Sequence, residues 1–315
     1  MSKIAFLFPG QGSQKIGMGR SFCEHYPVAQ DLFAQANTIL GFDLQTLCFE
    51  GPEETLKATE NAQVALYTTS VAAFLCLKEV CPVKPDAVAG HSVGEYAALT
   101  AAGVLDFAEG LRLVRTRGER MRDASQRMSG AMAALLGLEA EPAREACDEA
   151  RAATGKIVTV ANYNGGGQIV ISGEAEAVEK AGEIAKAKGA KRVMPIPVSG
   201  AFHSPLMVTA GDALFESISR ATFRKPSVRI VTNVDADYIE TPGDLMSALT
   251  RQVSGSVRWE ESILRLRNDG IETFVELGSG EVLTGLMRRI DRSAQALSVH
   301  DKPTLDAACE TLNRE

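Results

Sequence analysis

The stretch from Ala87 to Leu99 constrains the fold more than any other part of the chain. It reads A-V-A-G-H-S-V-G-E-Y-A-A-L, which is an apolar run, a turn of small residues and a segment rich in Ala and Leu. This order predicts a buried strand over 87–89, then a sharp turn, then a helix. The turn contains the pattern G-x-S-x-G, which in this context places a serine where a strand turns into a helix.

Two glycines explain how such a turn could form. Gly90 and Gly94 leave room for neighbouring backbone to pass close by. Ser92 would then project its hydroxyl from the carboxyl edge of the sheet, at the positive end of the following helix. That place suits an attacking oxygen and the oxyanion that it creates. The alternative is an ordinary glycine-rich turn whose serine only caps the helix.

The overall composition bounds the class of protein. A chain of 315 residues with 45% hydrophobic residues can bury a large core, as one large domain or as a large and a small one. The formal net charge of −7 argues against a nucleic-acid-binding protein, which would present a basic surface. This charge is still compatible with an acidic protein partner, because docking depends on a local patch.

The cysteines and apolar runs bear on compartment and metal binding. The six cysteines are scattered, with no C-x-x-C pair and no histidine at ligand spacing. They predict reduced thiols, without a disulfide framework or a metal site. The run 4–8 is too short for a signal-peptide core, and the longest apolar stretch, 64–77, falls short of a membrane span. We therefore expect a cytoplasmic protein that does not bind a membrane.

Residues 129–198 have a different pattern from the rest of the chain. Strand-like runs at 131–136, 157–161, 168–172 and 191–198 alternate with charged helical segments at 141–154 and 174–188. The order β-α-β-β-α-β is the ferredoxin-like arrangement. The sequence therefore predicts an α/β protein. Its large α/β-hydrolase-like domain with a parallel sheet comprises residues 1–128 and 199–315, and a small ferredoxin-like domain is inserted at 129–198.

In the large domain the patterns predict strands at 3–8, 87–89, 228–232 and 273–277, and helices at 21–40, 52–57, 64–80, 206–220, 245–253, 262–268 and 283–290. The loop 9–14 follows the first strand, and loops at the carboxyl ends of parallel strands often carry ligand-binding groups. Taken alone, this loop is an ordinary glycine turn.

A further helix is expected to begin after Asp106, with an apolar stripe that runs from Phe107 to Met121. The helix carries five arginines: Arg112, Arg115, Arg117, Arg120 and Arg122. At about 100° per residue, the first and fourth of them point away from the stripe, whereas the other three flank it. Most helix arginines are solvated, and the periodicity does not decide which of the three could face a site.

A serine nucleophile needs a base, which is usually a histidine. Of the four histidines, His91 is too close along the backbone to reach Ser92, and His25 and His300 lie in polar or charged segments. His203 remains, in a loop of small residues far along the chain, as the partners of such serines often are. No acidic residue stands out to orient it, so the orienting group is either an Asp such as Asp235 or a backbone carbonyl.

A set of motifs in a fixed order resembles one enzyme family. The motifs are F-P-G-Q-G-S-Q at 8–14, G-H-S-V-G-E at 90–95, Arg117-Gly118 with Met121, G-A-F-H-S-P-L-M at 200–207, Gln252, V-R-W at 257–259 and F-V-E-L-G-S-G at 274–280. Together they resemble the malonyl-CoA:acyl-carrier-protein transacylases over nearly the whole chain, including the ferredoxin-like insert. This set is far more specific than G-x-S-x-G alone.

The resemblance implies a two-step acyl transfer. Ser92 would attack the malonyl thioester with His203 as general base, and the phosphopantetheine thiol of acyl carrier protein would then take the malonyl group from the serine. Backbone N–H groups of Gln11 and Val93 would hold the oxyanion. A main-chain carbonyl near Gln252 would orient His203.

The resemblance also assigns the acyl pocket. Arg117 would bind the malonyl carboxylate as a bidentate pair, and Phe202 would narrow the pocket against methylmalonyl groups. The residues implied to line or support the pocket are Gln63, His91, Met121, Asn162 and Gln252. The implied partners are malonyl-CoA and acyl carrier protein. The expectation includes no cofactor, no metal, no nucleic acid and a monomeric enzyme.

Carrier proteins of this type are acidic, so a basic patch is expected near the mouth of the cleft between the domains. Its candidates are Lys188, Lys191, Arg192, Arg288 and Arg289. Three other functions stay open: a free-standing acyltransferase of polyketide assembly, a serine esterase or lipase, and a non-catalytic acyl-binding module. Acyl-CoA specificity would distinguish a polyketide acyltransferase from the transacylase. Transfer to a thiol acceptor would argue against an esterase or lipase, and covalent malonyl label on Ser92 would argue against a non-catalytic module.

Overall fold

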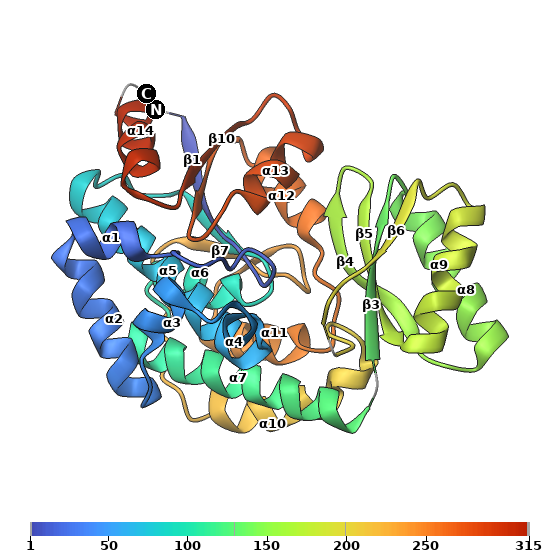
Figure 1. Ribbon diagram of the computed structural model, residues 1–315. Coiled ribbons are helices and arrows are strands. Elements are labelled where there is room, and N and C mark those ends of the chain that lie inside the picture. Colours follow the sequence, from blue (N-terminus) through green and yellow to red (C-terminus); the bar gives the residue numbers. More distant parts are fainter. Residues whose placement is uncertain (1, 129, 199, 314–315) are drawn as a thin grey trace.

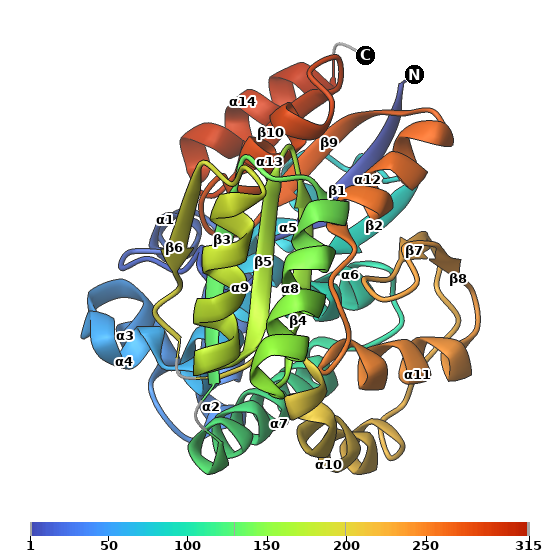
Figure 2. The ribbon, with the colours of Figure 1, turned by 90° about the vertical axis from the view of Figure 1, so that its right-hand side faces the viewer.

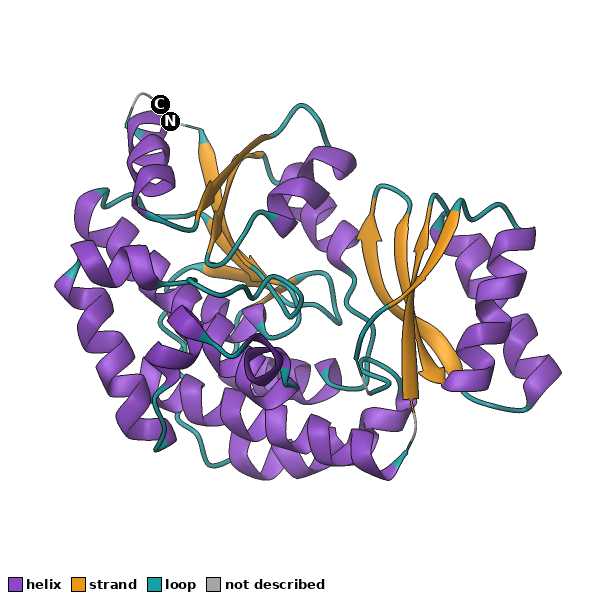
Figure 3. Ribbon diagram, in the orientation of Figure 1, coloured by secondary structure: helices purple, strands orange, loops and turns teal. Residues whose placement is uncertain are grey.

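The structure, a computed structural model, describes residues 2–128, 130–198 and 200–313. Two sheets lie side by side, each packed against helices of its own (Figure 1), and helices predominate around the larger sheet (Figure 3). The chain builds the first part of the large domain, then the small domain, and then returns to complete the large one.

The large sheet has six strands in the order β10-β9-β1-β2-β7-β8. They are β1 (Lys3–Phe8), β2 (Ala87–Gly90), β7 (Arg229–Val231), β8 (Tyr238–Ile239), β9 (Ile271–Leu277) and β10 (Gln295–Val299). All neighbours pair in parallel except β8, which is antiparallel to β7. The loops after β1, β2 and β7 therefore meet at one edge of the sheet, where open α/β sheets bind ligands.

Helices cover both faces of this sheet. Alternate residues of the apolar strand β1 therefore pack into two different core clusters, one on each face. The helices are α1 (Arg20–His25), α2 (Pro27–Leu40), α3 (Leu44–Glu50), α4 (Glu53–Lys57), α5 (Thr59–Val80), α6 (Gly94–Ala101), α7 (Phe107–Arg127), α10 (Val208–Ile218), α11 (Pro242–Gln252), α12 (Trp259–Asn268), α13 (Val282–Ile290) and α14 (Lys302–Leu312), with a 3-10 turn, η1, at Pro205–Met207. The long apolar stretch 64–77 is part of the buried helix α5. Among the described residues, no helix is long and apolar enough to cross a membrane.

The small sheet has four antiparallel strands in the order β4-β5-β3-β6. They are β3 (Gly130–Leu136), β4 (Val158–Gly165), β5 (Gln168–Glu174) and β6 (Arg192–Pro195), and the helices α8 (Ala140–Thr154) and α9 (Ala175–Ala187) cover one face. Both helices lie on the side turned away from the large domain (Figure 2). This is the ferredoxin-like arrangement, so the predicted fold class is confirmed.

A short segment of the large domain, 256–258, joins the edge of the small sheet. The N–H of Val257 donates to the carbonyl of Ala161 at 2.8 Å, and the N–H of Tyr163 donates to the carbonyl of Val257 at 2.9 Å. The two domains are thus bonded through backbone as well as through their covalent connections. The predicted boundaries include residues 129 and 199, which lie outside the described residues, so they stay a prediction.

Some elements differ from the sequence prediction in their bounds. The predicted helix 21–40 is divided into α1 and α2, because Tyr26 is extended before Pro27, which occupies the first turn of α2. Helix α5 begins at Thr59 rather than 64, so Gln63 lies within it. Strand β4 continues to Gly165 instead of ending at 161, so the Asn residues at 162 and 164 belong to a strand.

Four elements have no counterpart in the sequence prediction: α3, β8, β10 and α14. Local caps account for the two helices. Asp43 accepts a hydrogen bond from the N–H of Thr46 at the start of α3, and Asp301 and Thr304 form a reciprocal capping box at the start of α14. The predicted strand 191–198 is also shortened to β6, which ends at Pro195 on the sheet edge.

Candidate active site

Ser92 lies in the turn between β2 and α6, where the G-x-S-x-G pattern predicts it. Its φ of 53° is in the left-handed region that residues other than glycine rarely adopt. The two glycines are required by crowding. A Cβ on Gly90 would lie 2.1 Å from the carbonyl oxygen of Gly94, and a Cβ on Gly94 would lie 2.1 Å from that of Phe8. Neither position can take a larger residue unless the backbone moves.

His203 is the histidine that the fold brings to Ser92. Its Nε2 lies 2.8 Å from Ser92 Oγ. Its Nδ1 lies 2.8 Å from the carbonyl oxygen of Gln252 and 3.2 Å from that of Gly255. Because carbonyl oxygens only accept hydrogen bonds, Nδ1 carries the ring hydrogen and Nε2 is left to accept from the serine hydroxyl.

Of the two groups that could orient His203, the structure contains the backbone carbonyl. Asp235 instead binds Arg251 at 2.8 Å and the hydroxyl of Thr232 at 3.1 Å. The Asp235 alternative is therefore wrong. Carbonyl oxygens fix the ring and its tautomer without adding a negative charge to the site.

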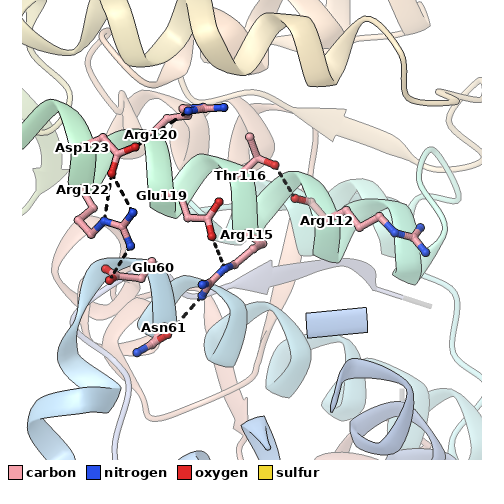
Figure 4. A network of polar contacts seen from close by, with 9 residues as sticks. All are labelled: Glu60, Asn61, Arg112, Arg115, Thr116, Glu119, Arg120, Arg122 and Asp123. Carbon is pink, nitrogen blue, oxygen red and sulfur yellow. Dashed lines mark hydrogen bonds and ion pairs between the residues drawn. The ribbon is translucent and has the colours of Figure 1, made fainter. Parts of the chain in front are cut away.

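The arginines of α7 divide into two groups. Arg115 and Arg122 are partly exposed and form ion pairs with Glu119 at 2.7 Å and with Glu60 at 3.1 Å (Figure 4). Arg117 is only 1% exposed. Of the three arginines that flank the apolar stripe, Arg117 is thus the one that the helix directs into the protein.

Arg117 binds neutral oxygens of the site. Its Nη1 donates to Gln63 Oε1 at 2.6 Å, and its Nη2 donates to Ser92 Oγ and to Gln252 Oε1, both at 3.0 Å. Its Nε is buried without a hydrogen-bond partner, and no carboxylate of the described residues lies within ion-pair distance of the guanidinium. An unpaired buried cation is costly. A ligand carboxylate would supply the missing charge and the missing acceptor.

The loop 9–14 lies beside the serine turn, because β1 and β2 are neighbours. A Cβ on Gly10 would be 2.5 Å from the carbonyl oxygen of His91, so the two backbones are in contact. The side chain of Gln11 lies 3.4 Å from the hydroxyl of Thr59. In the described part of the chain, no hydrogen bond is found for the N–H of Gln11 or of Val93. Both donors are therefore free to bind an oxyanion.

Three of the other predicted pocket residues are buried next to this group. Gln63 Nε2 donates to Met121 Sδ at 3.4 Å, so these two side chains support the guanidinium from one side. Phe202 is 5% exposed and directly precedes His203. Its ring lies against Gly200, where an added Cβ would be 2.5 Å away.

His91 and Asn162 connect the turn to the small domain. His91 Nε2 lies 2.9 Å from the side-chain oxygen of Asn164, and its ring packs against Trp259 with the centroids 5.4 Å apart. Asn162 pairs through its backbone with Val170 in β5. The side chain that binds His91 is thus that of Asn164, and the role of Asn162 in lining or supporting the pocket stays a prediction.

Sequence reasoning assigned no role to Glu95 and Asn233, which are 1% and 0% exposed below the serine turn. Glu95 Oε2 accepts hydrogen bonds from the N–H of Asn233 at 2.8 Å and from Gln252 Nε2 at 3.0 Å. Two signals were available. Glu95 is a charged residue inside a buried run, and Asn233 follows a parallel strand at the ligand-binding edge of the sheet.

Burial shifts the pKa values of several groups in this site, among them His203 and Glu95. Burial, and secondly the charge of Arg117, lowers the pKa of His203 to about 3. The imidazole is therefore neutral near pH 7, as a general base must be. Burial raises the pKa of Glu95 to about 7, although the hydrogen bonds from Asn233 and Gln252 act in the opposite direction.

The depressed pKa of His203 has a consequence for stability. Between its ordinary value of 6.5 and its folded value of about 3, only the unfolded chain binds the proton, so this residue destabilises the fold as the pH falls. His203→Asn removes the effect, and Asn tolerates the φ of 57° at this position. Between about pH 7.5 and about pH 4.5, the parent should lose about 2–3 kcal/mol more unfolding free energy than the variant.

Urea unfolding at both pH values measures this difference. The matched control is His25→Asn, because His25 is exposed on α1. The control should follow the parent. Equal losses in the parent and in His203→Asn would contradict the expectation.

Comparison with known proteins identifies the family. The model of the acyl transferase domain family matches residues 5–302. A malonyl CoA-acyl carrier protein transacylase of Bacillus subtilis is 46% identical over 315 residues, which are 100% of this chain and 99% of that protein. The chain belongs to the malonyl-CoA:acyl-carrier-protein transacylase family.

Solved transacylase structures match the whole molecule. The transacylase of Coxiella burnetii has a TM-score of 0.96 and 40% identity, and the match covers 99% of this chain and 98% of that one. A malonyl-transacylase in complex with its type II PKS acyl-carrier protein has a TM-score of 0.95 and 41% identity, covering 98% and 100%. The chain is an acyltransferase with the two-domain fold of the transacylases.

Proposed function

We propose that this enzyme transfers the malonyl group of malonyl-CoA to the phosphopantetheine thiol of acyl carrier protein, through a malonyl ester of Ser92, and so supplies fatty acid synthesis. One observation carries the proposal. A buried serine–histidine pair lies directly beside the guanidinium of Arg117, which is buried, bound only to neutral oxygens, and has a free Nε–H. This combination suits an acyl group whose far end is a carboxylate.

In the first step, Ser92 Oγ attacks the carbonyl carbon of the malonyl thioester while its proton passes to His203 Nε2. The N–H groups of Gln11 and Val93 bind the oxyanion, and each such donor is worth roughly a hundred- to a thousandfold in rate. When the intermediate collapses, the carbon–sulfur bond breaks and the coenzyme A thiolate takes the proton from His203. The ester of Ser92 remains.

In the second step, the carrier thiol gives its proton to His203 Nε2 and its sulfur attacks the ester carbonyl. The bond to Ser92 Oγ then breaks, and the serine recovers its proton from the imidazole. The reaction is therefore ping-pong. It needs no metal or cofactor of this chain, because the phosphopantetheine arm belongs to the carrier protein.

The guanidinium fixes the position of the acyl group in both steps. Gln63 and Gln252 already hold Nη1 and Nη2, so the fork is presented in one orientation with its Nε–H unpaired. A carboxylate that binds there forms charge-assisted hydrogen bonds in a buried site, where they are strong. We infer that this contact also keeps the ester carbonyl out of line with any water near His203, which favours transfer over hydrolysis.

The partner surface proposed for the acidic carrier lies at one end of the small sheet. Arg192 of β6 and Gln168 of β5 both pair with Leu136 of β3, and Arg289 of α13 donates to Gln168 at 2.9 Å. Arg192 and Arg289 are exposed at this junction of the two domains, as are Lys191 and Arg288 beside them in the chain. Positive charge there complements an acidic protein.

Lys188 does not belong to this surface as a free charge. Its ammonium binds Glu145 at 2.7 Å and Glu149 at 2.9 Å on α8, so the structure corrects its inclusion among the free positive charges of the patch. The basic surface is therefore defined as Lys191, Arg192, Arg288 and Arg289.

Charge reversal tests this surface. In the double variant Lys191→Glu/Arg192→Glu, we expect KM for holo-carrier protein to rise about three- to tenfold, because each exposed charge pair contributes about 0.2–1 kcal/mol. Hydrolysis of malonyl-CoA should not change, since neither residue touches the acyl site. Lys188→Glu is the control and should have a much smaller effect on KM. Equal effects on carrier transfer and on hydrolysis would refute docking at this surface.

The decisive test of the function isolates the two half-reactions. The enzyme is mixed with malonyl-CoA, freed of small molecules, and then given holo-carrier, apo-carrier or buffer. We expect the malonyl group to move stoichiometrically to the holo-carrier alone. Release as free malonate in all three samples would indicate an esterase. The rates of transfer to carrier proteins of fatty acid synthesis and of polyketide synthesis then show which pathway the enzyme serves. We propose in addition that the enzyme is a monomer in the cytoplasm.

A further inference from the structure

The strained backbone at Ser92 must be held by its surroundings. A non-glycine residue in the left-handed region costs on the order of 1–3 kcal/mol and persists only where the structure around it determines it fully. Ser92 has a φ of 53° and stands between a strand and a helix. The groups that bind its backbone therefore decide where its hydroxyl points.

One side chain, that of Asn233, binds the backbone on both sides of the turn. Its Oδ1 accepts from the N–H of Ser92 at 2.7 Å, and its Nδ2 donates to the carbonyl of Gly90 at 2.6 Å. The last regular pair between β2 and β7 joins Ala89 to Val231. Asn233 thus continues the ladder with its amide at the place where β2 leaves the sheet.

Asn233 is itself fixed at its backbone. Its N–H donates to Glu95 Oε2 at 2.8 Å, and its carbonyl accepts from the N–H of Arg258 at 2.9 Å. Gln252 Nε2 donates to the same Glu95 oxygen and to the carbonyl of Ser92, both at 3.0 Å. The backbone of Gln252 in turn orients His203. The support of the nucleophile and that of the base are therefore one buried network.

We propose that Asn233 is a positioning residue that holds Ser92 Oγ in line with His203 Nε2, an inference that rests on the proposed function. Its amide accepts from the N–H of Ser92 and donates to the carbonyl of Gly90. A side chain of similar size that is aliphatic, or that can only donate or only accept, cannot make both hydrogen bonds. It also occupies the N–H of Ser92. The donors left at the turn for an oxyanion are then those of Gln11 and Val93.

Single-turnover acylation tests the proposal. Asn233→Ala is mixed with saturating malonyl-CoA, and malonyl-enzyme is followed in time. Because a displacement of about 1 Å can cost on the order of a hundredfold, we expect the acylation rate constant to fall about a hundredfold. The apparent affinity for malonyl-CoA should stay within about threefold, since Asn233 binds the turn and not the carboxylate pocket.

The amplitude of malonyl-enzyme formation distinguishes a mispositioned serine from a loss of folded protein. A variant that is merely less stable loses amplitude in proportion to its unfolded fraction, whereas mispositioning lowers the rate constant of the folded molecules. Asn37→Ala is the matched control. Asn37 is another Asn that bonds backbone, at the N–H of Leu44, but lies far from the site on α2, so its rate constant should not change.

Asn233→Asp provides a second measurement if the alanine variant does not fold. It keeps the shape and the acceptor for the N–H of Ser92, but it presents an acceptor to the carbonyl of Gly90, so we expect at least a tenfold slower acylation. A rate constant within twofold of the parent in the variant that folds would overturn the proposal. The parent enzyme tests the proposed function separately. If the parent formed no malonyl-serine, the proposed reaction would be wrong, whereas the role of Asn233 is judged only by comparing the variants with an active parent.

Discussion

Ser92→Ala is expected to form no malonyl adduct with malonyl-CoA, whereas the parent gains one malonyl group per chain. The hydroxyl is the atom that bonds to the acyl carbon, and His203 has no other hydroxyl within hydrogen-bond distance in the described residues. Removing the nucleophile of a serine–histidine site costs roughly 10⁵–10⁶ in kcat. Transfer to the holo-carrier should fall by a similar factor.

Intact-mass measurement and the release of free coenzyme A check this result together. Ser262→Ala is the matched control, because Ser262 is also buried but its hydroxyl donates to the carbonyl of Arg258, at the start of α12, at 2.8 Å. It should acylate like the parent. A malonyl adduct on Ser92→Ala, mapped to any other residue, would remove Ser92 from the role of nucleophile.

Arg117→Ala is expected to lose malonyl transfer by a few kcal/mol, which is about a hundredfold or more in kcat/KM, the scale of a charge-assisted pair. Acetyl-CoA has no carboxylate, so its transfer should not fall and the preference for malonyl should disappear. Hydrolysis of the ester should rise, because the acyl group is no longer held. Arg117→Lys keeps the positive charge but loses the bidentate guanidinium, so its rate of malonyl transfer should lie between those of Arg117→Ala and the parent.

Arg115→Ala is the control for a lost arginine on the same helix. Arg115 binds Glu119 and Asn61 at the surface of α7 (Figure 4) and does not reach the site. Its malonyl and acetyl rates should match the parent. Unchanged malonyl turnover in Arg117→Ala would show that another group binds the carboxylate.

The sequence predicts best those parts of the molecule whose cause is local. The strand, turn and helix around Ser92 follow from an apolar run and two glycines, and the ferredoxin-like insert follows from the order of short periodic segments. His203 could be selected because a chain with four histidines offers few bases. The family resemblance selected Arg117 where helical periodicity left three arginines.

The parts that sequence reasoning misses depend on contacts between distant segments. Asn233 lies 141 residues from the N–H that it accepts from, and nothing near it in sequence distinguishes its amide from that of a loop residue. Because a backbone carbonyl has no side-chain signature, the residues alone left the group that orients His203 open, and only the family resemblance indicated a carbonyl near Gln252. Strand β10 is a short strand at the edge of the sheet, and it forms because β9 offers it a parallel partner.

The backbone pairing of 256–258 with β4 has a consequence for exchanging parts between relatives. This segment follows Gln252 and Gly255, whose carbonyl oxygens hold the imidazole, and it ends at the N–H that holds Asn233. A small domain transplanted from a relative would therefore have to pair correctly with this segment. Otherwise the carbonyl groups that orient His203 would shift, and the imidazole would point in a different direction. Altered carrier preference gained by swapping the small domain is therefore coupled to the geometry of the chemical step.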